Sequence, residues 1–141
     1  MTLCVQNHRC ILSDIVGADD HGGPRVRLFS AGENVERNLK IMREIYADVR
    51  IDNYVIMPNH VHILLTICGG DGAPRSSPPT NKLSNFVAAL KKFTNKAFGE
   101  NIWQRSFHDH IIRDQEDYNA RWQYIEENPK KWLMGKDEYY A

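Results

Sequence analysis

The chain has 141 residues, 42% of them hydrophobic and 26% charged, which is typical of a soluble globular protein and is enough for one core, so we expect a single domain over 1–141. Eighteen Lys and Arg balance eighteen Asp and Glu, which excludes a strongly basic protein and leaves a local basic face for contact with an acidic partner. Cys4, Cys10 and Cys68 lack C-x-x-C spacing, so we expect neither a disulfide framework nor a thiolate zinc site. No apolar window nears the ~18 residues that span a bilayer, so we expect a cytoplasmic protein without membrane contact.

The first third of the chain predicts short strands followed by a helix. Residues 2–7 and 11–16 are short apolar stretches that indicate an opening strand and its return, and residues 17–24 are rich in turn formers. A short strand over 26–29 leads to Ser30, which has Glu33 at the spacing of a capping box. The helix that we expect there has one apolar face, made of Val35, Leu39, Met42 and Ile45.

The middle of the chain predicts a strand pair and a second helix. Residues 49–57 and 61–67 are β-rich runs with a very short link, which favours an antiparallel pair. Residues 68–80 are dense in Gly, Pro and Ser and predict a mobile loop. A helical stripe then ends at Gly99, a natural C-cap, and comprises Leu83, Phe86, Val87, Leu90, Phe93, Ala97 and Phe98.

The last third predicts one more strand and helix. The strand covers 106–113, and Asp114 can cap a helix that runs to Glu127 or Asn128, where Pro129 stops it. The resulting order of strands and helices indicates an α+β fold with helices layered on a largely antiparallel sheet. A ferredoxin-like arrangement is the natural small solution.

His60 and His62 form the first candidate site. Residues two apart in a strand point to the same face, so both imidazoles can converge on one metal ion. For a lone H-x-H motif, surface or cross-strand hydrogen bonding is the alternative. The apolar neighbours Val61 and Ile63 favour the metal site, because a strand buried on its other face would hold the pair rigidly.

The last helix offers a second group of candidate residues. Tyr118, Trp122 and Ile125 make its expected core stripe, and Tyr124 falls off that stripe. Asn128 lies one turn after Tyr124, so the helix presents a phenol and a carboxamide on the same flank. The alternative for Asn128, which precedes a proline, is a cap at the helix C-terminus.

Three segments of the chain carry a family resemblance. They are residues 54–65 (YVIMPNHVHILL), 102–114 (IWQRSFHDHIIRD) and 124–132 (YIEENPKKW), and the opening residues 3–9 (LCVQNHR) match as well. Together they resemble the REP-associated tyrosine transposases, relatives of the insertion-sequence-200-like, single-tyrosine HUH transposases. In the family several residues usually precede the first strand, which here begins at Met1, so an incomplete sheet edge or an upstream start codon is expected.

The resemblance implies a fold and a function. The fold is a ferredoxin-like HUH core, and the activity is metal-dependent cleavage and rejoining of single-stranded DNA through a covalent 5′-phosphotyrosine. Position by position, it makes His60 and His62 ligands of Mg²⁺ or Mn²⁺, Asn128 a third ligand and Tyr124 the nucleophile. It also implies hairpin DNA as the partner and a monomer or homodimer as the active form.

Several basic and aromatic side chains are candidates for DNA contact. Lys91, Lys92 and Lys96 lie on the polar side of the second helix, and for each the alternative is a solvated helix face. The other candidates are Arg105, Arg113, His110 and Trp103, which either stacks on an unpaired base or is buried. Two rival functions remain at this stage: a catalytically silent nucleic-acid-binding module, and a metal-dependent hydrolase that uses water.

Overall fold

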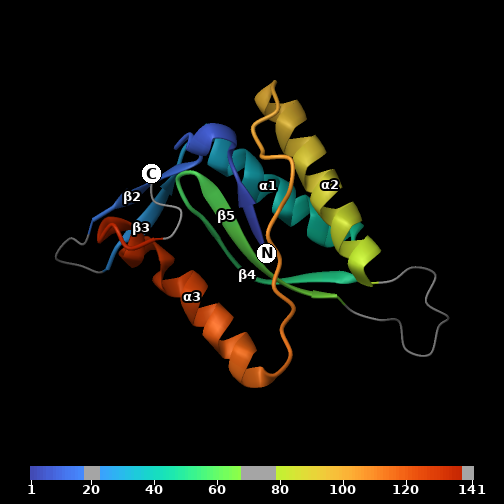
Figure 1. Ribbon diagram of the computed structural model, residues 1–141. Helices are drawn as coiled ribbons and strands as arrows, with labels where there is room; N and C mark the ends of the chain where they lie inside the picture. The colour runs from blue at the N-terminus through green and yellow to red at the C-terminus, as the bar shows by residue number, and fades with distance from the viewer. Residues whose placement is uncertain (18–22, 68–78, 138–141) are drawn as a thin grey trace.

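The computed structural model describes residues 1–17, 23–67 and 79–137. Its centre is a three-stranded antiparallel sheet in the order β1-β5-β4, built from β1 (Thr2–Cys4), β5 (His60–Ile67) and β4 (Val49–Ile56). Helices α1 (Ser30–Ile45) and α2 (Pro79–Phe98) cover one face, and α3 (Gln115–Leu133) covers the other (Figure 1). The predicted α+β fold, with helices on an antiparallel ferredoxin-like sheet, is therefore confirmed.

The two faces of β5 look into different cores. Val61 and Ile63 are buried in the larger core with residues of α1 and α2. Leu64 is buried in a smaller core with Ile125 of α3. Because successive side chains of a strand alternate between faces, His60 and His62 share the face of Leu64. The sheet therefore presents both imidazoles to α3.

Strands β4 and β5 form the predicted antiparallel pair, from Val49 opposite Ile67 to Ile56 opposite Val61, with a shift of register between Ile51 and Asn53. Backbone hydrogen bonds from the first part of the chain fix the short link between β4 and β5. The Leu12 amide donates to the Pro58 carbonyl (3.0 Å), and the Val5 amide donates to the Asn59 carbonyl (2.9 Å). These hydrogen bonds fix the position where β5 begins.

The opening strand does not return on itself as predicted. It is shorter than 2–7, because Gln6–His8 form a 3-10 turn (η1) in which Asn7 and His8 have φ values of 58° and 53°. This turn leads the chain away from β1, which pairs with β5 instead. Strand β2 (Ser13–Val16) pairs with β3 (Arg25–Leu28) in a separate two-stranded sheet. In the turn-rich run 17–24, residues 18–22 lie outside the described residues.

Helix α1 starts without the predicted capping box. Its N-cap is Phe29, which makes no side-chain cap. The Phe29 amide instead donates to the Leu12 carbonyl (3.0 Å), so the backbone of the chain ahead of β2 holds the helix start. Gly32 makes this approach possible, because a Cβ there would lie 2.1 Å from the Leu12 carbonyl oxygen. Of the predicted face, Val35, Leu39 and Met42 are buried, whereas Ile45 is exposed.

Helix α2 begins at Pro79, inside the range 68–80 predicted as a loop, and residues 68–78 of that range lie outside the described residues. Phe86, Val87 and Leu90 are buried as predicted. Phe93, Ala97 and Phe98 are exposed, because the buried face of the last turns is carried by Thr94, whose hydroxyl accepts a hydrogen bond from Trp103 Nε1 (2.7 Å). Gly99, with a φ of 96°, ends the helix as predicted.

The predicted strand over 106–113 is wrong. The segment that lies beside β1 is earlier, with isolated bridges of Trp103 to Val5 and of His108 to Thr2. Lys91 of α2 holds this segment, because its ammonium donates to the carbonyls of Gln104 (2.8 Å) and Arg105 (3.2 Å). Since β1 begins at Thr2, His108 is the last residue of the segment with a β1 partner, and the following residues lead to α3.

Helix α3 runs further than predicted. Asp114 caps it as expected, with Oδ1 accepting from the Asp117 amide (2.8 Å). It continues through Pro129 to Leu133, although a proline removes one hydrogen bond of the helix and its ring crowds the carbonyl four residues earlier. Pro129 is buried, which offsets this loss, whereas Trp122 of the predicted stripe is 40% exposed. None of the helices in the described part of the chain has the length and apolar character needed to cross a bilayer.

A candidate active site between strand β5 and helix α3

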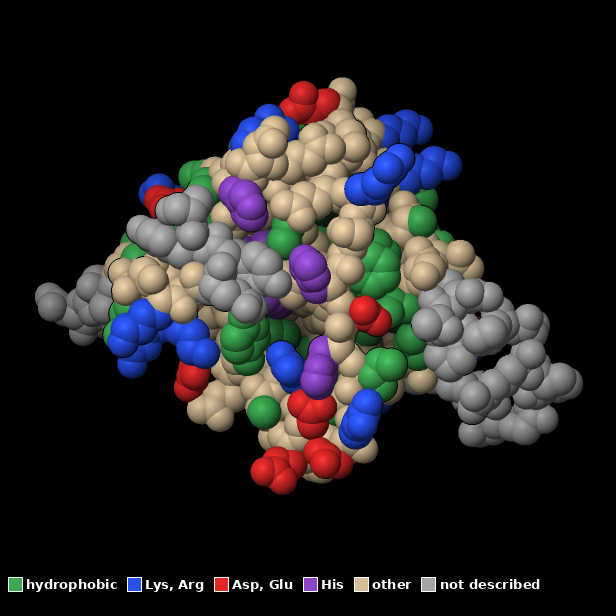
Figure 2. Space-filling model, viewed as in Figure 1, with side chains coloured by type: hydrophobic (Ala, Val, Ile, Leu, Met, Phe, Trp, Pro, Cys, Tyr) green, Lys and Arg blue, Asp and Glu red, His purple; other side chains and the backbone are tan. Residues whose placement is uncertain are grey.

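His60 and His62 lie side by side beneath α3. Their exposed fractions are 0% and 5%, and their ring centroids are 4.6 Å apart. The Nε2 atoms of both rings are buried. Histidine side chains also run down the middle of the molecular face shown in Figure 2, between α3 and the segment that follows α2. The H-x-H motif therefore forms a compact pair in the interior and is not a surface feature.

Both imidazoles are neutral at physiological pH. Burial lowers the pKa of His60 to about 4. Burial, together with the neighbouring His60 ring, the N-terminal ammonium and the Arg121 guanidinium, lowers the pKa of His62 to about 2. A neutral imidazole keeps a lone pair on one nitrogen, which is the form that binds a metal ion.

Hydrogen bonds to Nδ1 select which nitrogen keeps that lone pair. His60 Nδ1 lies 2.7 Å from Asn59 Oδ1, and an amide oxygen only accepts, so Nδ1 carries the proton. His62 Nδ1 makes a hydrogen bond of 2.7 Å with the Thr2 hydroxyl, which can accept in the same way. The lone pair of each ring then lies on Nε2. This arrangement of partners behind a histidine is typical of metal sites.

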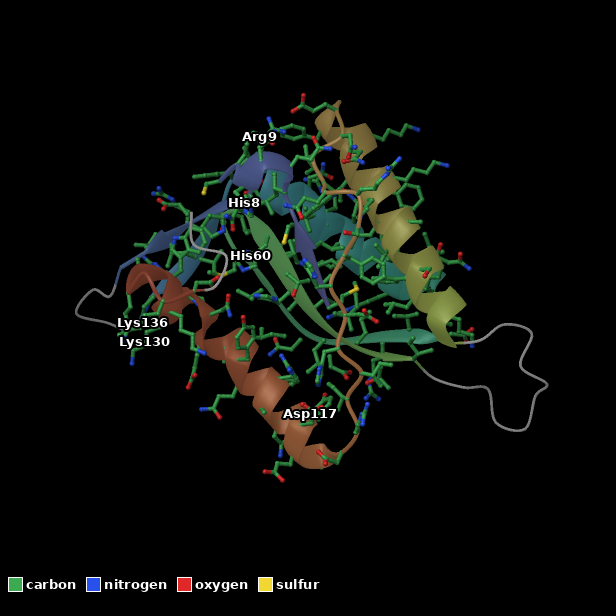
Figure 3. All side chains as sticks on the ribbon, viewed as in Figure 1. His8, Arg9, His60, Asp117, Lys130 and Lys136 are labelled. Atoms are coloured by element: carbon green, nitrogen blue, oxygen red, sulfur yellow. The ribbon has the colours of Figure 1, made fainter. Side chains whose placement is uncertain are left out.

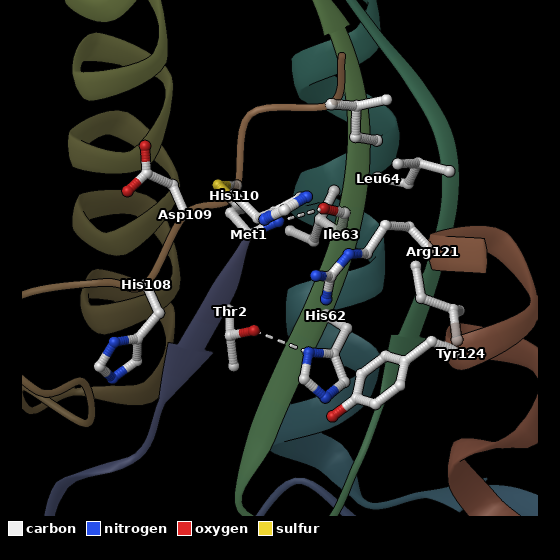
Figure 4. Close-up of a pocket in the computed structure, with 12 residues that line it drawn as sticks. Met1, Thr2, His62, Ile63, Leu64, His108, Asp109, His110, Arg121 and Tyr124 are labelled. Carbon is white, nitrogen blue, oxygen red and sulfur yellow. Dashed lines mark hydrogen bonds between the residues drawn. The ribbon is translucent and has the colours of Figure 1, made fainter. Parts of the chain in front are cut away.

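Tyr124 meets the histidine pair from α3. Its ring centroid lies 5.1 Å from that of His62, with the rings at 72° to each other. Figure 4 shows the phenol beside the imidazole, with its hydroxyl directed along the His62 ring and away from the helix. Tyr124 is half-buried, whereas Ile125 is buried, as expected for a residue beside the core stripe. The two halves of the predicted site thus come together within one chain.

Asn128 completes the group. It is fully buried, and its Nδ2 donates to the Tyr124 carbonyl (3.2 Å). Its side chain partly offsets the lowering of both imidazole pKa values by burial, so the carboxamide lies against both rings. Because α3 continues to Leu133, Asn128 is not a C-terminal cap of the helix.

The donor set fits a divalent cation. Over residues 1–17, 23–67 and 79–137, no three His, Cys, Asp or Glu side chains gather closely enough to hold a metal ion by themselves. A third ligand would have to be another kind of group, and the buried Asn128 carboxamide lies against both rings. Two imidazoles and one amide oxygen leave coordination positions for phosphate oxygens or water, and they suit Mn²⁺ better than Mg²⁺ by ligand preference.

Asp137 is a site residue that the sequence analysis missed. Gly135, with a φ of 67°, follows the end of α3 and turns the chain back. This brings the buried Asp137 carboxylate to within 3.9 Å of His60 Nε2. Nothing in the local sequence distinguishes this aspartate, and only the continuation of α3 past Pro129 sets its position.

Some of the candidate DNA-contact residues are buried or bonded within the protein, and others are exposed to solvent. Trp103 is 1% exposed and donates to Thr94, so it is a core residue and offers no ring for base stacking. The Lys91 ammonium donates a hydrogen bond to the Gln104 carbonyl in the segment beside β1. Lys92 and Lys96 are exposed on α2, and Arg105 and Arg113 are exposed after it. These four are reachable from solvent, but none of them lines the pockets beside Tyr124.

A pocket opens next to the phenol. His62, His108, His110, Arg121 and Tyr124 are among its lining residues. The predicted candidate His110 makes a hydrogen bond of 2.8 Å between Nε2 and Asp117 Oδ2. His110 thus lines the pocket without belonging to the His60–His62 pair. Arg121 is a second residue that the sequence analysis missed, although it lies one helical turn before Tyr124.

Known proteins resemble the chain over this same architecture. No family model matches it. An uncharacterized protein of Haemophilus influenzae is 27% identical over 158 aligned positions, which cover the whole chain and 83% of that protein. The REP-associated tyrosine transposase of Escherichia coli is 33% identical over 81 positions, which cover 57% of the chain and 44% of the transposase. A putative REP-associated tyrosine transposase of Haemophilus influenzae is 32% identical over 82 positions.

A solved structure resembles the model as well. It is that of a REP-associated tyrosine transposase bound to a REP hairpin, with a TM-score of 0.63 and 26% sequence identity, over 92% of the present chain and 64% of the other. The chain spans less than half the length of the two curated transposases. The fold of the chain is transposase-like. More narrowly, the chain is a relative of the REP-associated tyrosine transposases.

Proposed function

We propose that the protein cleaves and rejoins single-stranded DNA with Tyr124 as the nucleophile. The observation that carries this proposal is the contact between the Tyr124 ring and the buried His60–His62 pair, at 5.1 Å from His62. A phenol beside two neutral imidazoles and a carboxamide is a nucleophile next to a cation site, which is the combination that phosphoryl transfer requires.

Cleavage forms one bond and breaks another at the same phosphorus. The Tyr124 oxygen loses its proton and attacks the phosphorus, and the 3′ oxygen leaves and takes up a proton. The products are a 5′-phosphotyrosine and a free 3′-OH. Because the phosphodiester energy is conserved in the covalent link, the reverse reaction rejoins a strand without nucleotide hydrolysis.

His60, His62 and Asn128 would hold Mg²⁺ or Mn²⁺ in this reaction. When bound, the cation offsets negative charge on the non-bridging phosphate oxygens. The protein residues prepare for it: Thr2 and Asn59 orient the imidazoles, and the Tyr124 carbonyl fixes the Asn128 amide. Asp137, 3.9 Å from His60 Nε2, adds a negative charge at the same place.

The substrate that we propose is a DNA hairpin with a single-stranded flank. This comes from the relative of known structure, which is bound to a REP hairpin. The cut then falls in the unpaired part, because only an unpaired strand can bring its phosphate to a phenol that is half-buried between β5 and α3.

The test is an assay with end-labelled hairpin DNA and Mn²⁺. The proposal predicts Mn²⁺-dependent cleavage with the protein attached to the 5′ end of one product. Tyr124→Phe should abolish both cleavage and attachment and leave hairpin binding within about twofold, since only the nucleophile is removed. If Tyr124→Phe cleaves at the rate of the wild type, the assignment of the nucleophile is wrong.

The same assay separates the two rival functions. Cleavage without attached protein would indicate a hydrolase that activates water at the histidine pair. Binding without any cleavage would indicate a silent nucleic-acid-binding module. A His60→Gln, His62→Gln double variant serves as the metal-site control, and it should bind the hairpin without cleaving it.

A further inference from the structure

A second pocket lies on the other side of Tyr124. Arg121, Tyr124, Lys131, Lys136 and Asp137 line it. Arg121 and Tyr124 also line the first pocket, which contains His62 and His108. The two pockets therefore meet at these two side chains. A ligand that enters both must continue on both sides of the point beside the phenol.

Arg121 stands at this meeting point. It lies three residues before Tyr124, and its guanidinium is near enough to His62 to lower the pKa of that imidazole. Figure 4 shows it extending from α3 toward His62 and the Ile63 backbone, alongside Tyr124. Its Nε is 3.7 Å from Asp117 Oδ1, and its side chain is 43% exposed. Such an exposed ion pair is weak, so the guanidinium can exchange it for a phosphate.

Lys131 flanks the phenol on the side of the second pocket. Its Nζ lies 4.9 Å from the centroid of the Tyr124 ring. At about 100° per residue, Arg121 and Lys131 fall within roughly 60° of Tyr124 around the helix, whereas Lys130 falls about 120° away. The second pocket holds three cations, Arg121, Lys131 and Lys136, against the single carboxylate of Asp137. Figure 3 shows Lys130 and Lys136 at the C-terminal end of α3, and Asp117 toward its start.

We infer that Arg121 and Lys131 bind two successive phosphates of a single strand: Arg121 holds the phosphate beside Tyr124, and Lys131 holds the next phosphate in the second pocket. A phosphodiester backbone continues on both sides of each phosphate, as the paired pockets require, whereas a free phosphate or a mononucleotide does not. A guanidinium fork matches two phosphate oxygens, and an ammonium supplies a point charge. This inference deepens the proposed function and rests on it for the role of Tyr124.

The test measures binding of a labelled oligothymidylate, which has a backbone and no hairpin. The full chain carries Tyr124→Phe, so that no strand is cut. On this background, Arg121→Gln and Lys131→Gln should each weaken affinity about tenfold at low salt and reduce the slope of log K against log salt by about 0.7, the value for one phosphate contact on a single strand. Arg121→Lys should retain the slope, because the charge remains.

Lys130→Gln is the matched control. It removes the same charge from the same helix, outside both pockets, and should leave affinity and slope unchanged. Thermal unfolding midpoints of all variants are compared first, and since these side chains are at least partly exposed they should agree closely. Equal slopes for Arg121→Gln, Lys131→Gln and Lys130→Gln would overturn the inference. So would a parent protein that does not bind the oligothymidylate.

The outcomes separate this inference from the proposed function. If the variants show the predicted slopes but the protein never attaches to cleaved DNA, the phosphate contacts are supported and the proposed nuclease activity is wrong. If the protein attaches to cleaved hairpin DNA through Tyr124 but Arg121→Gln and Lys131→Gln do not change binding, the proposed nuclease activity is supported and the phosphate contacts are wrong.

Discussion

At the scale of single residues, the orientation of the two histidines depends on the side chains that hydrogen-bond to them. Thr2 and Asn59 each make a 2.7 Å hydrogen bond to Nδ1 of one of the two histidines. These hydrogen bonds fix the orientation of each ring and leave the lone pair on Nε2. The sequence drew attention to the H-x-H motif, but the partner of His62 comes from residue 2, sixty positions earlier, through the pairing of β1 with β5.

The first prediction concerns this partner. Thr2→Val removes the hydroxyl and keeps the shape of the side chain, so we expect Mn²⁺ affinity, measured by calorimetry, to fall 10–100-fold, as for other partners of metal-binding histidines. Thr2→Ser should restore most of the affinity. Ser13→Ala is the control, because it removes another buried hydroxyl, which donates to the Ile56 carbonyl away from the site. A Thr2→Val protein with the Mn²⁺ affinity of Ser13→Ala would show that this hydrogen bond does not prepare the site.

At the scale of elements, patterns within one segment were predictable and pairings between distant segments were not. The β4–β5 pair followed from two β-rich runs with a short link, and the cap at Asp114 followed from its residue type. The passage of α3 through Pro129 did not, because local propensity ends the helix there and burial of Pro129 against the body overrides it. Asp137 was missed for the same reason.

The 106–113 segment shows the same limit. Ile111 in this segment is 73% exposed. The bridges to the first residues of the chain are made by Trp103, which precedes the segment, and by His108 near its start. Lys91 fixes the segment beside β1 by donating hydrogen bonds to the carbonyls of Gln104 and Arg105. Such contacts with backbone carbonyls leave no pattern in the sequence. The sequence analysis assigned this lysine to DNA on the basis of its charge alone.

The second prediction tests this element. Lys91→Met removes the ammonium and keeps the aliphatic chain, so we expect a loss of about 1–2 kcal/mol in the free energy of unfolding, from charge-assisted hydrogen bonds that are partly exposed. Amide exchange at Thr2 and His108, which bond to each other's carbonyls, should become faster. Lys92→Met removes the neighbouring, exposed charge and should change stability by less than about 0.5 kcal/mol. If both variants unfold alike in urea, Lys91 does not hold the segment.

At the scale of the whole molecule, the histidine pair lies at the junction between the sheet and α3. Two neutral imidazoles buried there couple the protonation of the site to the stability of the fold. Their pKa values, about 4 for His60 and about 2 for His62, lie below the ordinary value of 6.5 because burial disfavours the charged form. The same burial that prepares both rings for a cation at neutral pH therefore makes the protein sensitive to acid.

The third prediction follows from the sign of these shifts. Between pH 6.5 and about 4, the unfolded chain binds protons at both histidines that the folded chain does not bind, so the free energy of unfolding of the metal-free protein must fall as the pH falls. Each pKa unit corresponds to about 1.4 kcal/mol, so His60 alone accounts for a loss of about 3 kcal/mol across this window. Urea unfolding in EDTA, at pH values from 7 down to about 5.5, measures the upper part of this window before most carboxylates titrate. The His60→Gln, His62→Gln variant should show a much flatter profile over the same range.

Adding Mn²⁺ at pH 7 should stabilise the wild type, by about 2.7 kcal/mol at a hundredfold excess over the dissociation constant, and leave this variant unchanged. A wild-type profile as flat as that of the double variant would mean that the folded protein binds protons at the two rings as readily as the unfolded chain does, so burial would not lower their pKa values.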